Sequence, residues 1–184
     1  LQKTAATAWE NTAIAYAHLF NKVLQKEQSL IYSLPPISIA HIKRMSRSFG
    51  MIQFSKGNRP DIKTGYTLDD NVRALMALCH VYVKTKDPSC EKYIKKYLTF
   101  IRYCQQPDGS FLNYVDKQLA FTTQNAEINL EDSNARAIYA LGYFISLRGK
   151  FPDVWTEDAT EIIEQTFDMI MKIRSPRSIA YIIK

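Results

Sequence analysis

Two short stretches of the chain place carboxylates beside an arginine at the start of a strongly apolar helical pattern. The first stretch is Gly65–Leu75, with the sequence GYTLDDNVRAL, and the second is Asn129–Ile138, with the sequence NLEDSNARAI. Paired carboxylates can serve as the acid and the base or nucleophile of glycoside cleavage, which holds them about 5–9.5 Å apart. The candidate catalytic residues are Asp69, Asp70, Glu131 and Asp132.

These carboxylates also have a simpler interpretation as helix caps. An Asp in the first turn accepts free backbone N–H groups and is favoured by the positive end of the helix dipole. Capping needs one carboxylate, whereas each stretch holds two, followed within one turn by Arg73 or Arg136. If both stretches line one cavity, crowding of like charges raises the pKa of one carboxyl group and supplies an acid. Repeat architecture is a further explanation, because an arginine could bridge neighbouring helical hairpins.

A third stretch, Asp108–Tyr114, has the sequence DGSFLNY. Asp-Gly is ordinary turn chemistry. In the extended piece that follows, Phe111 and Tyr114 could form the floor of a sugar site, and Asn113 could supply polar contacts. The remaining candidate substrate-binding residues are Asn71, Arg73, Asp108 and Arg136.

Several other chemistries have no matching motif. The chain lacks a GxSxG motif, a phosphate-binding loop and a dinucleotide fingerprint. The magnesium pair of prenyl-transfer enzymes needs a carboxylate where this chain has Arg73. Binding of a metal ion by the oxygens of the paired carboxylates is a less specific interpretation. His18, His41 and His80 are isolated in the sequence. We therefore expect no metal and no cofactor.

Length and composition indicate one domain or slightly more. The chain has 184 residues, of which 46% are hydrophobic and 12% aromatic, so it can form a sizeable core. Many aromatic rings are compatible with sugar stacking, although most such rings belong to a core. The net charge is +6, but Lys and Arg are scattered rather than gathered in a stripe, which argues against nucleic-acid binding.

The cysteines indicate the compartment. Cys79, Cys90 and Cys104 are odd in number and form no CxxC pair, so neither a disulfide framework nor a zinc site is predicted. A reducing, cytoplasmic setting is the simplest expectation. No apolar run of about 18 residues is present, so no membrane span is predicted.

Hydrophobic periodicity predicts an almost entirely helical chain. A stretch with the sequence RALMAL, beginning at Arg73, aligns with RAIYAL beginning at Arg136, at an offset of 63 residues. Short extended pieces are expected at 51–55 and 111–115, and a long polar loop at 116–129, where length favours a functional role. Helices are expected at about 4–28, 36–48, 68–85, 88–105, 131–147, 153–173 and from 176 onward.

The repeat predicts an all-α fold of stacked αα-hairpins, forming a partial (α/α) toroid. Helices 68–85, 131–147 and the one from 176 would be inner helices, with 88–105 and 153–173 outside them. An open helical solenoid is the alternative. Only about two and a half hairpins are present, and both termini resemble the interior of a longer protein. Exposed apolar helix faces then favour self-association, so a homo-oligomer is possible.

The three motifs, taken in order, resemble the helical region that follows the catalytic part of certain bacterial retaining glycosyltransferases. That region is similar to the six-hairpin glycosidase toroids. The likeness covers roughly 35–184, and the stretch AWENTAIAYAHLF from Ala8 looks like the closing helix of a two-Rossmann-domain glycosyltransferase. The resemblance implies that residues 1–30 are a terminal helix and linker of an upstream transferase domain, and that 31–184 form the toroid-like domain.

The resemblance implies a carbohydrate-active domain that binds a glycan or acceptor in an acidic funnel, with the upstream transferase domain as its partner. The donor-nucleotide site would lie outside this chain. One alternative is a glycoside hydrolase that uses the paired carboxylates. Another is a non-catalytic helical scaffold in which Arg bridges bury the carboxylates.

Overall fold

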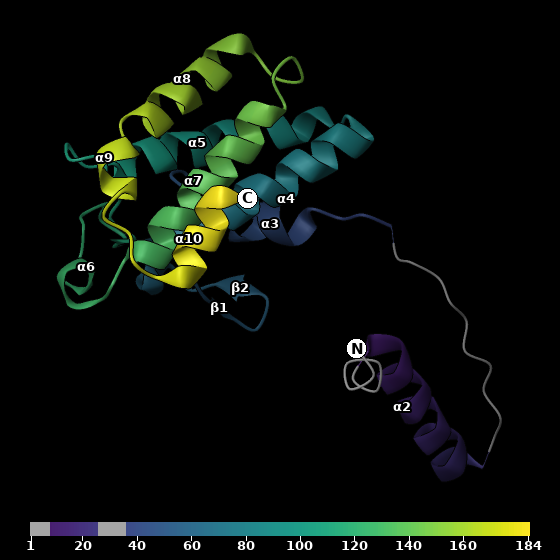
Figure 1. The fold of residues 1–184 in the computed structure, drawn as a ribbon. Helices are drawn as coiled ribbons and strands as arrows, with labels where there is room; N and C mark the ends of the chain where they lie inside the picture. Colours follow the sequence, from purple (N-terminus) through teal and green to yellow (C-terminus); the bar gives the residue numbers. More distant parts are fainter. Residues whose placement is uncertain (1–7, 26–35) are drawn as a thin grey trace. The chain divides into compact units, whose positions relative to one another are not determined.

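The computed structural model describes residues 8–25 and 36–184 (Figure 1). The chain divides into two compact units, Leu1–Ile37 and Ser38–Lys184. In the first unit, helix α2 spans Trp9–Leu24, inside the helix predicted for 4–28. None of its side chains is buried. The caps predicted at Thr4 or Thr7 and most of the break predicted at 29–36 lie outside the described residues.

Helix α4 spans Leu68–Thr85, as predicted. It begins there because the Thr67 hydroxyl accepts the backbone N–H of Asp70, which is the usual N-cap bond. Its buried face carries Leu68, Val72 and Leu75, which are at most 1% exposed. The helix ends where Lys86 adopts a left-handed conformation at φ 56°.

Helix α7 spans Glu131–Ser146, one residue short of the predicted end. Small side chains such as Ala137 and Ala140 are fully buried on it, which allows neighbouring helices to approach closely. It packs against α4, against helix α8 (Asp153–Glu164) and against helix α10 (Pro176–Ile183). It is therefore the central helix of the second unit.

The region between α4 and α7 also follows the prediction. Asp87 accepts the N–H of Ser89 at 2.9 Å, a 3₁₀ turn η2 covers Pro88–Cys90, and helix α5 continues over Glu91–Cys104. A turn with Gly109 at φ 81° follows. Strand β4 (Tyr114–Val115) then pairs antiparallel with strand β3 (Tyr66–Thr67), immediately before α4. The predicted loop 116–129 contains one short helix, α6 (Gln124–Glu127).

The single helix predicted for 153–173 is wrong. It is interrupted at Gln165 and Thr166, so that α8 ends at Glu164 and helix α9 covers only Phe167–Ile170. The backbone of Gly109 packs against this interruption, since a Cβ added to Gly109 would overlap the Gln165 carbonyl oxygen. Thr166 is fully buried, and its hydroxyl donates to the Ile163 carbonyl oxygen.

The helix predicted for 36–48 is also shorter than expected. Helix α3 covers Ala40–Met45 because the chain then turns to form an antiparallel bridge between Ser46 and Met51. A small hairpin of β1 (Ser55–Lys56) and β2 (Arg59–Pro60) follows, then a 3₁₀ turn η1 over Ile62–Thr64.

Two layers of helices make up the second unit (Figure 1). Helices α4, α7 and α10 pack in sequence in one layer, while α5 packs on α4 and α8 packs on α7 in the other. The core between them includes Leu78, Ile101, Phe144 and Ile162. The protein is thus mostly helical, in agreement with the predicted all-α class. In the described part of the chain, no helix combines the length and apolar character needed to cross a membrane.

Candidate functional site

Arg136 joins the two acidic helix entrances. Its Nε lies 2.8 Å from Oδ2 of Asp132, one turn earlier on α7, and 3.3 Å from Oδ1 of Asp69 on α4. Two carboxylates that share one nitrogen must be neighbours. Helices α4 and α7 therefore begin side by side, as the sequence repeat predicted.

A third helix entrance belongs to the same cluster. Arg177, in the first turn of α10, places its Nε 2.9 Å from Oδ1 of Asp132 and its Nη2 3.0 Å from Oδ2. Sequence reasoning missed Arg177 because α10 lacks the acidic motif. The sequence signal that could have found it is the position of Arg177 in its helix. Arg177 is the second residue of α10, as Asp69 is of α4 and Asp132 is of α7.

The other two candidate carboxylates have different roles. Glu131 accepts the backbone N–H groups of Arg174 and Ser175, at 3.1 and 2.7 Å, and so holds the segment that leads into α10. Asp70 accepts the Thr67 hydroxyl at 2.6 Å, and Oδ1 of Asp70 lies 3.4 Å from Arg73. Both residues stabilise helix entrances through these bonds.

Charge in the cluster is balanced. Asp69, Asp70 and Asp132 face Arg73, Arg136 and Arg177, and Asp69 is also paired with Arg73 at 2.7 Å. Burial raises the pKa of the Asp69 carboxyl above its ordinary value, and the charges of Arg73 and Arg136 only partly oppose that rise. The aspartate side chains remain 25–36% exposed, so solvent reaches the cluster.

A hollow of about 150 Å³ opens beside the two acidic entrances. Asn113 and Tyr114 reach it because the pairing of β3 with β4 carries the third motif to the start of α4. Oδ1 of Asn113 accepts the backbone N–H of Asp69 at 3.0 Å. The hollow is lined by Asp69, Asn113, Tyr114, Ile128, Asn129, Leu130, Asp132 and Ser133.

Three residues predicted to bind substrate lie elsewhere. Asn71 is fully buried, and its amide is bonded to the backbone of Met51 and Thr67. Phe111 is fully buried in the core, so its ring cannot form the floor of a sugar site. Asp108 is exposed at its turn and accepts the N–H and the hydroxyl of Ser110. Their roles are structural, because each bond fixes local backbone.

An aromatic face that the motifs did not reveal continues from the cluster along α7 and α10. The Arg136 guanidinium carbon lies 5.0 Å from the centroid of the Tyr181 ring, and the Tyr181 and Tyr139 rings are 5.9 Å apart. Further along, Tyr143 stacks on His80 of α4 at 4.6 Å, with a hydrogen bond of 2.9 Å between them. The missed signal was helical spacing, since Asp132, Arg136, Tyr139 and Tyr143 follow one face of α7.

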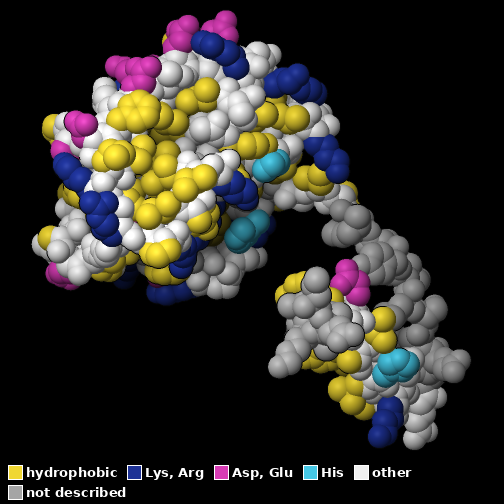
Figure 2. Space-filling view, viewed as in Figure 1, with side chains coloured by type: hydrophobic (Ala, Val, Ile, Leu, Met, Phe, Trp, Pro, Cys, Tyr) yellow, Lys and Arg dark blue, Asp and Glu magenta, His cyan; other side chains and the backbone are white. Residues whose placement is uncertain are grey.

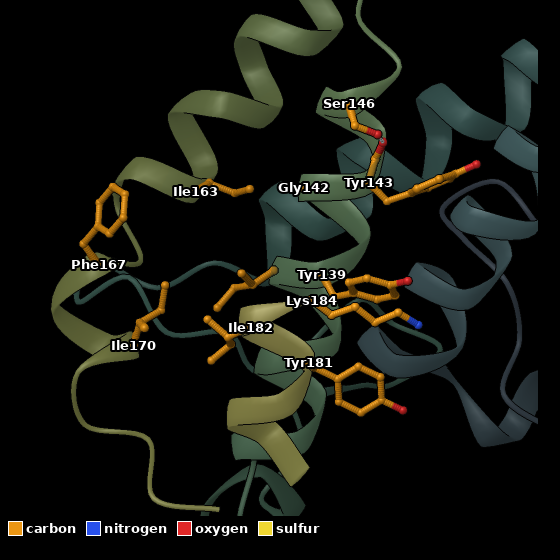
Figure 3. A pocket seen from close by; sticks show the side chains of 11 residues that line it. Tyr139, Gly142, Tyr143, Ser146, Ile163, Phe167, Ile170, Tyr181, Ile182 and Lys184 are labelled. Atoms are coloured by element: carbon orange, nitrogen blue, oxygen red, sulfur yellow. Dashed lines mark hydrogen bonds between the residues drawn. The ribbon is translucent and has the colours of Figure 1, made fainter. Parts of the chain in front are cut away.

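These tyrosines border a larger hollow of about 520 Å³. Figure 3 shows Tyr139, Tyr143, Tyr181 and Lys184 on one side of it, and Ile163, Phe167 and Ile170 on the other. Figure 2 shows hydrophobic side chains gathered on this face of the second unit. The hollow thus has an aromatic side with polar groups and an aliphatic side.

Metal chemistry has no evident site in the part of the chain that the structure describes, where His, Cys, Asp and Glu form no group of three suited to an ion. Comparison with known proteins adds no assignment: no protein-family model and no curated protein sequence matches this chain.

Proposed function

We propose that this chain is the carbohydrate-binding helical domain of a glycosyltransferase-like protein. It binds a glycan or acceptor at the entrances of α4, α7 and α10. The observation that carries the proposal is the position of Arg136, whose Nε lies within 3.3 Å of Asp69 and Asp132 beside a solvent-reached hollow. The resemblance of the three motifs to the helical regions of bacterial retaining glycosyltransferases supports the same class.

The chemistry of the hollow suits a sugar. Sugar hydroxyl groups both donate and accept hydrogen bonds, and here carboxylate acceptors and guanidinium donors stand together. Oδ1 of Asp69 and Oδ1 of Asp132 are buried, accept no hydrogen bond from any described residue and each contact a guanidinium, so these two oxygens hold the arginines in place rather than contact the ligand. The amide of Asn113 adds a further polar group and Tyr114 an aromatic ring.

We favour binding over hydrolysis. Cleavage needs one protonated carboxyl group and one free carboxylate in defined positions. Asp69 has the raised pKa that an acid needs, but two arginines pair with it, and Glu131 is bonded to backbone N–H groups. These pairings occupy the carboxylates, so they suit orienting a ligand better than acting as a free acid and base.

The proposed architecture is a partial (α/α) toroid of stacked hairpins. Its support is that α5 packs on α4 and α8 on α7, while α4, α7 and α10 are neighbours with their first turns together. Such a layer of parallel inner helices gathers its N-termini at one end. Cytoplasmic localisation is part of the same proposal, since the three cysteines are free and buried.

Titration of the chain with a panel of neutral and acidic oligosaccharides, followed by amide NMR shifts, tests the proposed binding. We expect one class to perturb the amides of Asp69, Asn113 and Asp132. Asp132→Asn should weaken binding by about tenfold or more, because a hydrogen bond to a charged group is worth about 1.5–3 kcal/mol. The matched control is Asp158→Asn, which alters an exposed carboxylate 3.7 Å from Arg102 on another face.

Product analysis of the same mixtures tests hydrolysis. Release of shorter sugars that stops in Asp69→Asn would favour the hydrolase alternative. If no oligosaccharide of the panel perturbs these amides, the proposed function is overturned.

A second candidate is a non-catalytic scaffold. The contacts that favour it are those that tie helices together: Arg177 to Asp132, and Glu131 to the N–H groups before α10. Under this hypothesis, Arg136→Ala and Asp132→Asn reduce stability, and no glycan binds. Measuring unfolding and glycan binding on the same variants separates the two functions.

A further inference from the structure

We propose that the aromatic face beyond the cluster extends the glycan site, so that the ligand is an oligosaccharide lying along α7 rather than a single sugar. This inference rests on the proposed function and specifies its ligand. The entrance cluster binds one end of the ligand, and the tyrosines of α7 and α10 stack on the following sugar rings.

The face is built from equivalent positions of three helices. On α7, steps of four, three and four residues lead from Asp132 to Tyr143, and the same steps on α4 lead from Asp69 to His80. Because residues at these spacings lie on one side of a helix, each helix presents a continuous row. The rows are Asp132, Arg136, Tyr139 and Tyr143 on α7; Asp69, Arg73, Met76 and His80 on α4; and Arg177 and Tyr181 on α10, continued by Lys184 directly after its end.

Contacts between neighbouring rows join them into one surface. Arg136 connects the polar end to the aromatic part, since it pairs with Asp132 and stacks on Tyr181. The Lys184 ammonium lies 5.2 Å from the centroid of the Tyr139 ring, and Tyr143 stacks on His80. Along α7, each residue of the row is three or four positions from the next between Asp132 and Tyr143.

The tyrosine side chains are accessible to a ligand. Tyr139, Tyr143 and Tyr181 are only partly buried and border the hollow of about 520 Å³. That volume lies within the range of about 300–1,000 Å³ that is usual for ligand sites. In Figure 3 these rings project on the side of the hollow opposite Phe167, together with Lys184.

The chemistry of the face selects a neutral sugar chain. A tyrosine ring offers an apolar face and a polar hydroxyl, which match the C–H face and the hydroxyl edge of a pyranose. The rows carry Asp69 and Asp132 beside four cations, and Asp70 of the entrance cluster adds a third carboxylate that pairs with Arg73. Charge is therefore nearly balanced over the face and its entrance, and a strongly charged ligand gains little. The eleven steps along the helix from Asp132 to Tyr143 span about 16 Å, which exceeds one sugar ring and accommodates several.

The test compares short and long neutral oligosaccharides of one linkage, taken from the class that binds the chain. Affinity should rise with chain length for the unmodified protein. Tyr139→Ala and Tyr143→Ala should each weaken binding of the longest glycan roughly three- to tenfold, as expected for loss of one ring contact. Neither variant should weaken binding of the monosaccharide, whereas Asp132→Asn should weaken binding of the monosaccharide and of the longest glycan.

Two further variants separate stacking from folding. Tyr143→Phe keeps the ring and should retain most of the affinity for the long glycan. Tyr93→Ala removes a tyrosine of α5 that also lies under lysine side chains but belongs to another face, and it should have no effect. Far-ultraviolet circular dichroism of each variant confirms that the helices are intact.

The outcomes distinguish this inference from the proposed function. Glycan binding that does not depend on chain length, or that tolerates both alanine substitutions, would overturn the extended site and leave the entrance site standing. Absence of glycan binding by the unmodified chain would overturn both.

Discussion

Arg136 Nε lies 3.3 Å from Oδ1 of Asp69, although the two residues begin different helices. The same nitrogen is 2.8 Å from Asp132, so one side chain that is only 15% exposed serves carboxylates from both copies of the repeat. The contact makes the first turns of α4 and α7 neighbours. The contact therefore links the candidate site to the packing of the two helices, which also share a buried apolar core.

Loss of Arg136 should destabilise the protein more than loss of a surface arginine. In Arg136→Ala, Asp69 and Asp132 lose their shared partner while partly buried, which should cost about 1–3 kcal/mol in the free energy of unfolding. Arg102→Ala removes an exposed pair with Glu161, which should cost at most about 1 kcal/mol. Urea denaturation measures both, and equal losses would show that the Arg136 bridge is energetically unimportant.

Asp69 should titrate above an ordinary aspartate. Burial raises its folded pKa above the unfolded value of about 3.9, so the folded state binds this proton more readily. Between the two pKa values, the contribution of Asp69 to stability therefore falls as pH rises. NMR titration of the side-chain carboxyl carbon measures the midpoint, which should move still higher in Arg136→Ala.

The pKa of Asp108 should be shifted in the opposite direction, so Asp108 is the internal control. Hydrogen bonds from the Ser110 hydroxyl and backbone N–H lower its pKa. Its contribution is present above the unfolded pKa and is lost as pH falls through the folded one. An Asp69 midpoint at or below that of Asp108 would contradict the assigned burial effect.

Two asparagines at the repeat offset should be structural. Asn134 Oδ1 accepts the Phe111 N–H at 2.7 Å, and its amide donates to the Phe111 carbonyl; Asn71 bonds Met51 in the same way. Asn134→Ala leaves buried backbone groups unpaired, each costing about 1–3 kcal/mol. Asn58→Ala, on an exposed loop, should change stability by at most about 0.5 kcal/mol. Thermal and urea unfolding compare the two, and similar stabilities would refute the role of Asn134.

Substitution by alanine should change the stability of the protein differently at three glycines. Gly109 and Gly149 both have φ 81°, but a Cβ on Gly109 overlaps the Gln165 carbonyl oxygen, whereas the Cβ on Gly149 meets nothing within 4 Å. Gly149→Ala should cost about 1–2 kcal/mol from backbone strain alone. Gly109→Ala should cost more than about 3 kcal/mol, because the Gln165 segment must move.

Gly142, in the interior of α7, is the third member of this set. A Cβ added there meets no other atom within 4 Å, and the backbone is helical, so alanine should stabilise the helix by about 0.5–1 kcal/mol. Chemical denaturation of the three variants should give the order Gly142, Gly149, Gly109 from most to least stable. Any other order would show that local contacts do not control these positions.

Local sequence was sufficient for the main helices. Thr67 and Asp87 are capping residues, and apolar spacing marks the buried faces of α4, α5 and α7, so their bounds were predicted within a few residues. The two acidic motifs also indicated that helix entrances meet, because repeats place equivalent positions side by side. The glycosyltransferase-like function remains a prediction from motif resemblance.

The division of roles among the candidate residues was decided by tertiary structure. Asn71 and Asp69 stand two positions apart in one motif, yet Asn71 is fully buried against Met51 while Asp69 reaches the hollow. The two side chains point in different directions because a helix turns about 100° per residue. Only the packing of the helices shows which side chain faces a neighbouring element.

The sequence by itself determined where the principal helices begin and which motifs repeat, since caps and apolar spacing act within a few residues. Only the tertiary structure placed Arg177 against Asp132, aligned the tyrosines of α7 and α10, and interrupted the helix at Gln165. Each of these depends on a contact between segments distant in the chain. Local spacing can indicate which face of a helix carries such residues, but not which residues meet, because the free energy of the contact comes from the partner and not from neighbouring residues.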